Sequence, residues 1–179
     1  IHGDIDRIAK KIVDDLLDSG DQEAVDFVDK VAAPLPIAVI AWLLGVPESD
    51  WNLIFEWTNR TIGAGDPEYQ KEGENAAETA NAAMIELFGY FTRLVEEKRK
   101  NPADDLVTLF ANAEVDGKKL EPMDVLAWCF IIVVAGNETT RNATSGGMLA
   151  LIEHQEELRK VQKDPDLLKP MVEEMLRWT

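Results

Sequence analysis

Cysteine and histidine are scarce in this chain of 179 residues. Its single cysteine, Cys129, excludes an internal disulfide and favours a reducing compartment. The two histidines, His2 and His154, stand far apart, so no Cys/His cluster has the spacing of a zinc site. The sequence also lacks a glycine-rich phosphate loop and a Gly-x-Ser-x-Gly elbow. Zinc, nucleotide and serine-hydrolase sites therefore find no support.

Basic residues are the minority, with 18 Lys and Arg against 34 Asp and Glu and a net charge of −16. This balance argues against nucleic acid as a partner, because such binding depends on basic side chains that neutralise phosphates. It also disfavours anionic membrane surfaces. The apolar run over residues 125–135 is shorter than the about 20 residues that cross a bilayer. We therefore expect a buried core helix, no membrane segment and a cytoplasmic protein.

Hydrophobic periodicity and helix-breaking residues predict a mainly helical, all-α chain without linkers or repeats. For residues 24–31 the sequence allows either a helix or a short extended piece. Residues 115–118 are typical of a tight turn. Helices are expected over residues 4–19, 37–44, 48–62, 74–100, 104–112, 122–154, 155–162 and 168–178.

The most unusual stretch is Ala135-Gly136-Asn137-Glu138-Thr139-Thr140, which continues the apolar run inside one long helix. Glycine in a helix costs about 1 kcal/mol relative to alanine, and buried acids and hydroxyls need partners. With 100° per residue, Ala135 lies about 40° and Ile132 about 20° from Thr139. Together with Gly136 they form one small, smooth face that carries a hydroxyl. The residues alone leave two interpretations open, a functional site or packing with a local hydrogen bond.

This hexapeptide resembles the oxygen-activating motif of the cytochrome P-450 family of haem-thiolate monooxygenases. A Glu-x-x-Arg signature follows at Glu174 to Arg177, in the family's order. Weaker likenesses are Trp42 to Pro47, which resembles a helix end of soluble bacterial members, and Asp104-Asp105-Leu106 with the later residues 117–120. The resemblance spans nearly the whole chain. It implies the helical middle of the P-450 fold, a single partial domain over residues 1–179.

The resemblance also implies roles for the central helix. Glu138 would deliver protons and Thr139 would steady the oxygen during cleavage of the O–O bond, as the catalytic pair. The cofactor would be haem b, with its thiolate ligand outside this chain. Residues expected to line the haem and oxygen groove are Ile132, Ala135, Gly136 and Thr139. Residues expected to contact substrate are Ile131, Val134, Ala135 and Thr140.

The resemblance further implies an apolar organic substrate, and we expect a sterol, terpenoid or fatty chain. It also implies a redox partner such as a ferredoxin, which supplies electrons. The family's Phe-x-x-Gly-x-x-x-Cys-x-Gly loop, which carries the haem thiolate, does not occur in the sequence. We interpret the chain as an internal fragment, truncated at both ends and inactive by itself. The alternative is a non-enzymatic, degenerate helical module that binds a hydrophobic ligand or a protein partner.

Four further features have a structural interpretation. Glu174 and Arg177 share a helix face and can pair, although Glu173 is also within reach of the arginine. Cys129 is expected to be a core cysteine and not a thiolate ligand, because an apolar helix raises a thiol's pKa. His154 is expected at the surface. The last feature is a largely aromatic segment that consists of Trp51, Phe55, Trp57 and Thr61. In the family this segment helps to roof the substrate pocket, but an aromatic stripe on a helix is more often part of the hydrophobic core.

Overall fold

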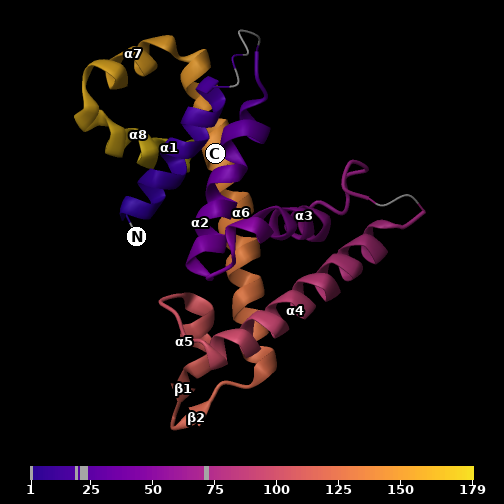
Figure 1. Ribbon diagram of the computed structural model, residues 1–179. Coiled ribbons are helices and arrows are strands. Elements are labelled where there is room, and N and C mark those ends of the chain that lie inside the picture. The colour runs from indigo at the N-terminus through magenta and orange to yellow at the C-terminus, as the bar shows by residue number, and fades with distance from the viewer. Residues whose placement is uncertain (1, 19, 21–23, 71–72) are drawn as a thin grey trace. The chain divides into compact units, whose positions relative to one another are not determined.

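The computed structural model describes residues 2–18, 20, 24–70 and 73–179, and these are mainly helical (Figure 1). The eight predicted helices are confirmed within a few residues at their ends; residue 19, the predicted end of the first, lies outside the described residues. The segment 24–31, for which the sequence allowed a helix or an extended piece, forms no strand, and its second half belongs to a π-helical turn, η1 (Val28–Ala32). The helices are α1 (His2–Asp18), α2 (Pro34–Leu43), α3 (Trp51–Ile62), α4 (Ala76–Lys100), α5 (Leu106–Asn112), α6 (Pro122–Glu153), α7 (Gln155–Lys163) and α8 (Leu168–Trp178).

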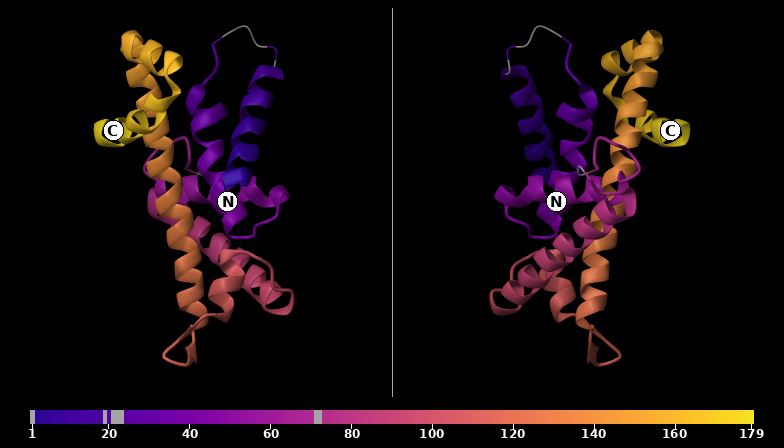
Figure 2. Two further views of the ribbon diagram at one scale, coloured as in Figure 1. Left: turned by 90° about the vertical axis from the view of Figure 1, so that its left-hand side faces the viewer. Right: turned by 90° about the vertical axis from the view of Figure 1, so that its right-hand side faces the viewer.

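The chain divides into two compact units, one of residues 1–36 and 137–179 and the other of residues 37–136. Helix α6 belongs to both, since it is one unbroken helix across the division at residue 136 (Figure 2).

The unit of residues 37–136 holds the main hydrophobic core. Helix α3 packs on α4, and α4 packs on α5. Apolar side chains from these helices, from α2 and from the first half of α6 meet in one cluster. Its fully buried members include Leu44, Ile54, Leu87, Phe91, Val107, Val125, Cys129 and Val133.

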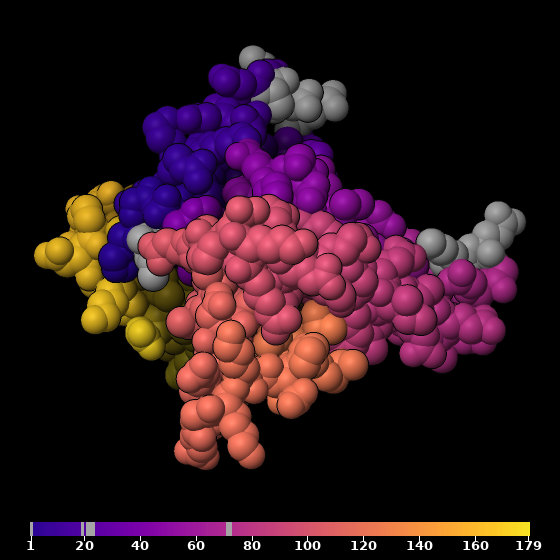
Figure 3. Space-filling view, turned by 60° about the horizontal axis from the view of Figure 1, so that its bottom comes forward, coloured from indigo at the N-terminus to yellow at the C-terminus, as the bar shows by residue number. Residues whose placement is uncertain are grey.

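Local signals set the ends of these elements. Asn75 Oδ1 accepts hydrogen bonds from the backbone N–H groups of Ala77 and Glu78, while Glu78 Oε2 accepts one from the Asn75 N–H; this capping box begins α4. The strands β1 (Glu114–Val115) and β2 (Lys118–Lys119) pair antiparallel around Asp116 and Gly117, which have φ values of 51° and 73°. Two residues with positive φ form the turn typical of tight hairpins. The hairpin projects beyond α4 in Figure 3.

The expectation that α6 is buried on all sides is wrong. From Val125 to Asn137 its buried residues fall on one stripe at intervals of four, while Trp128 and Ile131 on the other side are about half exposed. Gly147, further along α6, is also buried but does not continue this series of four-residue intervals. Over this first half of α6 the rest of the helix surface is partly buried or exposed, although it is apolar all round. The stripe consists of Val125, Cys129, Val133 and Asn137.

Among the described residues, α6 alone is long and apolar enough to cross a membrane, by length and composition only. This is weak evidence, because core helices of soluble proteins meet the same criterion.

In the other unit, small residues of α6 allow α8 to approach closely. A Cβ at Gly147 would meet the Met175 side chain at 2.6 Å, and one at Gly146 would meet Thr179 Cγ2 at 2.6 Å. Both glycines are therefore sites of close helix packing.

Candidate functional site

The exposed face of α6 carries residues that the sequence assigned to substrate and cofactor. Ile131, Ala135 and Thr139 are all exposed and follow one another at intervals of four, so they lie along one side of the helix. Ile132 and Val134 flank them and are partly buried. Thr140 is exposed, and its carbonyl accepts a hydrogen bond from Thr144 Oγ1 at 2.8 Å.

Gly136 has a close neighbour within its own unit. A Cβ built at this residue would lie 2.8 Å from Cδ1 and 3.4 Å from Cγ1 of Ile40, on α2. The absence of a side chain thus lets α2 pack against α6. The sequence instead led us to expect Gly136 in the groove for haem and oxygen. The placement of Gly136 in a cofactor groove stays a prediction, and this contact does not support it.

Glu138 forms hydrogen bonds on its own helix. Its Oε1 accepts a hydrogen bond from Arg141 Nη2 at 2.5 Å and one from Asn142 Nδ2 at 3.4 Å. The spacings of three and four residues place all three side chains on adjoining parts of the helix surface. The acid assigned to proton delivery is therefore held by a cation and an amide.

Asn137, which the sequence interpretation gave no role, is fully buried. Neither Oδ1 nor Nδ2 of its amide has a hydrogen-bond partner among the described residues. Buried polar groups are nearly always paired, so this amide is an exception in the centre of α6. Its spacing of four from Val133 was the sequence signal that placed it on the buried stripe.

Cys129 is a core residue, as expected. Burial raises the pKa of its thiol to about 12. The side chain therefore stays protonated near neutral pH and does not supply a thiolate. No group of three or more His, Cys, Asp or Glu side chains within the described part of the chain is arranged to hold a metal ion.

The Glu-x-x-Arg residues pair with each other. Arg177 Nε donates to Glu174 Oε2 at 2.7 Å, which confirms Glu174 rather than Glu173 as the partner. The hydrogen bond from Arg177 lowers the pKa of the Glu174 carboxyl. Both side chains are exposed, so this pair stabilises α8 only weakly.

The aromatic segment of α3 serves the core. Trp57 is buried, and its Nε1 donates to Glu86 Oε2 on α4 at 2.6 Å. Trp51 Nε1 donates to the Val46 carbonyl at 3.0 Å, and Thr61 Oγ1 to the Trp57 carbonyl at 2.7 Å. Trp51 and Phe55 are partly buried against the same cluster. The Trp57–Glu86 bond joins α3 to α4, and the packing of Trp51 and Phe55 agrees with the core interpretation. A contact with substrate stays a prediction.

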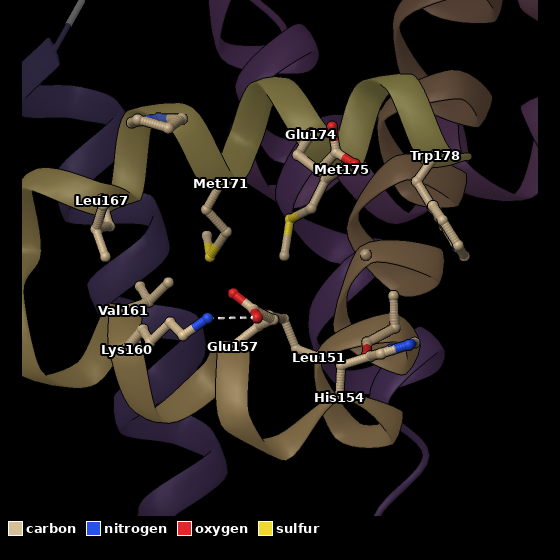
Figure 4. A pocket seen from close by; sticks show the side chains of 13 residues that line it. Leu151, His154, Glu157, Lys160, Val161, Leu167, Met171, Glu174, Met175 and Trp178 are labelled. Atoms are coloured by element: carbon tan, nitrogen blue, oxygen red, sulfur yellow. Dashed lines mark hydrogen bonds and ion pairs between the residues drawn. The ribbon is translucent and has the colours of Figure 1, made fainter.

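A cavity of about 360 Å³ lies between α7, α8 and the end of α6, in the unit that holds the C-terminus. Figure 4 shows Met171 and Met175 of α8 facing Val161 and Glu157 of α7 across it, while Trp178 lies over His154 at the end of α6. His154 at its edge is exposed, as expected, with its ring 6.3 Å from that of Trp178. None of the residues assigned to oxygen, haem or substrate lines this cavity.

Comparison with known proteins identifies the class. The family model for cytochrome P-450 matches residues 17–170. The chain is 39% identical over 170 residues to a steroid C26-monooxygenase of Rhodococcus jostii, covering 95% of the chain and 34% of the relative. It is 36% identical over 171 residues to a methyl-branched lipid omega-hydroxylase of Mycobacterium bovis, covering 95% of the chain and 39% of that protein.

Solved structures agree. The cytochrome P-450 PksS of the bacillaene polyketide synthase from Bacillus subtilis matches with a TM-score of 0.84 and 33% identity, over 98% of this chain and 42% of that one. The chain belongs to the cytochrome P-450 family, a family of haem-dependent oxidoreductases, and it has a mainly helical portion of that fold. It spans about a third to two fifths of the length of these relatives.

Proposed function

We propose that the protein carrying this chain is a haem-dependent monooxygenase that inserts one atom of dioxygen into an apolar organic substrate. The observation that carries the proposal is the exposed face of α6, where Ala135 and the hydroxyl of Thr139 lie beside the acid Glu138. Family membership and relatives named as monooxygenases support it. The chain is a single partial domain of that enzyme in this proposal.

Part of this face fits a flat macrocycle. Ala135 and Thr139 are exposed and small, so no bulky side chain stands on this part of the helix surface. Ile132, Ala135 and Thr139 would hold haem b, and Gly136 completes the set of four residues that the family resemblance implies. Haem supplies the reduction of dioxygen when bound. Its thiolate ligand comes from outside these 179 residues, since Cys129 is buried and protonated.

Glu138 and Thr139 would supply protons. The Thr139 hydroxyl, on the exposed face, both donates and accepts hydrogen bonds, so it can steady a ligand and pass on a proton. Glu138 lies about 100° around the helix from it, and therefore acts through the hydroxyl or through water. An acid beside an alcohol forms such a relay.

The substrate would contact Ile131, Val134, Ala135 and Thr140, a largely apolar set. Two relatives are named for oxidation of a steroid and of a methyl-branched lipid, so we assign an aliphatic carbon of a sterol, terpenoid or fatty chain. Electrons would come from a ferredoxin or similar redox partner. The protein would be cytoplasmic, without nucleic-acid or membrane partners. The 179-residue chain by itself would be inactive.

The test is Thr139→Ala in the full-length protein. We expect haem binding and the absorption band of the reduced carbon monoxide complex to persist, while oxygen consumption yields peroxide instead of product. Thr144→Ala removes a hydroxyl from the same helix beyond the assigned site and is the matched control. In this variant oxygen consumption should stay coupled to product formation.

Full coupling in Thr139→Ala would overturn the assigned role. A full-length protein without the carbon monoxide band would instead favour the non-enzymatic helical module, because that band requires a thiolate-ligated haem.

A further inference from the structure

The Glu138–Arg141 pair is less exposed than two other ion pairs of the same spacing, Glu157–Lys160 and Glu174–Arg177. The side chains of Arg141 and Glu138 are 16% and 32% exposed, whereas those of Arg177 and Glu174 are 64% and 59% exposed. A partly desolvated, charge-assisted hydrogen bond holds its geometry more firmly than one in open solvent. The carboxylate of Glu138 therefore has a defined orientation.

The two donors to this carboxylate lie on either side of it. From Glu138, Arg141 lies about 60° around the helix away from Thr139, and Asn142 lies about 40° toward Thr139. Both hydrogen bonds reach the same oxygen, Oε1. Within the described residues Oε1 thus has two donors, and Oε2 is the oxygen at which a further donor or a proton can bind.

We propose that Arg141 is a positioning residue, which fixes Glu138 through Oε1 so that Oε2 is the oxygen that takes up and releases the proton. Asn142 assists from the side of Thr139. In this step Oε2 takes up one proton from the solvent pool and donates it to the Thr139 hydroxyl oxygen, while that hydroxyl gives its own proton to the ligand beside it. The carboxylate and the hydroxyl are both regenerated and no electrons move. The inference deepens the proposed function and depends on it.

The test compares Arg141→Gln with Arg141→Lys in the full-length, haem-loaded protein. Arg141→Gln should lower the ratio of product to oxygen consumed about tenfold, because it removes the charged hydrogen bond. Arg141→Lys keeps a cation and should recover most of that ratio, although an ammonium cannot reproduce the planar guanidinium fully. Arg159→Gln, on the exposed surface of α7, is the control for loss of one positive charge.

A second readout does not involve turnover. The infrared carboxylate band of Glu138, identified by its disappearance in Glu138→Gln, should shift in Arg141→Gln and return toward its original position in Arg141→Lys. A merely structural arginine would leave this band unchanged.

An unchanged band and unchanged coupling in Arg141→Gln would overturn the inference, and so would a shifted band with full coupling. Neither result affects the proposed function. Full coupling in Glu138→Gln, by contrast, would remove the acid from the proposed function itself, whatever the Arg141 variants show.

Discussion

A Cβ atom at Gly136 would lie 2.8 Å from Cδ1 of Ile40, so the motif's glycine is a packing contact between α6 and α2. The two residues are 96 positions apart in the chain and both lie in the unit of residues 37–136. Only the terminal methyl of Ile40 comes closer than an ordinary carbon contact.

This contact predicts coupling between substitutions at the two residues. In an Ile40→Val background, which removes Cδ1, Gly136→Ala should raise the free energy of unfolding by about 1 kcal/mol through helix propensity. In the wild-type background the gain should be smaller, or become a loss, because the new Cβ displaces the methyl group. Chemical denaturation of the four proteins measures the difference. Equal effects of Gly136→Ala in both backgrounds would show that the contact is absent.

The unpartnered amide of Asn137 predicts a stabilising substitution. Asn137→Leu should raise the free energy of unfolding by about 1–2 kcal/mol, since an apolar side chain of similar size removes a buried donor and acceptor that lack partners. Asn52→Leu, on the exposed surface of α3, should change it by less than about 0.5 kcal/mol. Loss of stability in Asn137→Leu would mean that an ordered water satisfies the amide.

Local signals made most elements predictable. The end of α6 was expected near residue 154 and lies at Glu153, and the Asp116-Gly117 turn was expected from its residue types. The Glu174–Arg177 pair followed from spacing on one helix turn. These features depend on neighbours in sequence, which periodicity and turn chemistry describe well.

Long-range contacts were not predictable in the same way. Since the first half of α6 is apolar on every side, periodicity could not tell its covered stripe from its exposed one. The partner of Gly136 lies on a different helix, and no pattern in the sequence points to Ile40. Arg141 is the opposite case, because its spacing of three from Glu138 was visible in the sequence and the pairing was missed.

A buried ion pair predicts a pH-dependent stability. Lys98 Nζ lies 2.6 Å from Asp105 Oδ2, and the two side chains are 14% and 5% exposed. Burial alone would raise the pKa of Asp105, but the Lys98 ammonium and the Thr108 amide and hydroxyl outweigh it and lower the pKa. The folded-state pKa is thus below that of the unfolded chain, about 3.9. The ionised carboxylate therefore stabilises the fold above that value, and this contribution is lost as the pH falls through the folded-state pKa.

Asp105→Asn tests this pair while keeping the side-chain oxygen that caps α5. Near neutral pH we expect a loss of about 2 kcal/mol in the free energy of unfolding, because Lys98 is left without its counter-ion. The difference from wild type should shrink as the pH drops below about 4. Asp104→Asn removes the same charge at an exposed neighbour and should show little effect. A pH-independent difference for Asp105→Asn would contradict the ionic origin.

The burial of Cys129 predicts that its thiol reacts slowly in the folded chain. With full burial and a pKa of about 12, both access and thiolate content are low, so disulfide-exchange reagents should react at least about 100-fold more slowly than in denaturant near pH 8. Because the chain has one cysteine, the labelling rate reports on this residue alone. In the full-length protein, Cys129→Ala should also keep the carbon monoxide band, since another thiolate holds the haem in our proposal. Loss of that band with the fold intact would make Cys129 the ligand, and rapid labelling of the folded chain would show that α6 opens at this buried stripe.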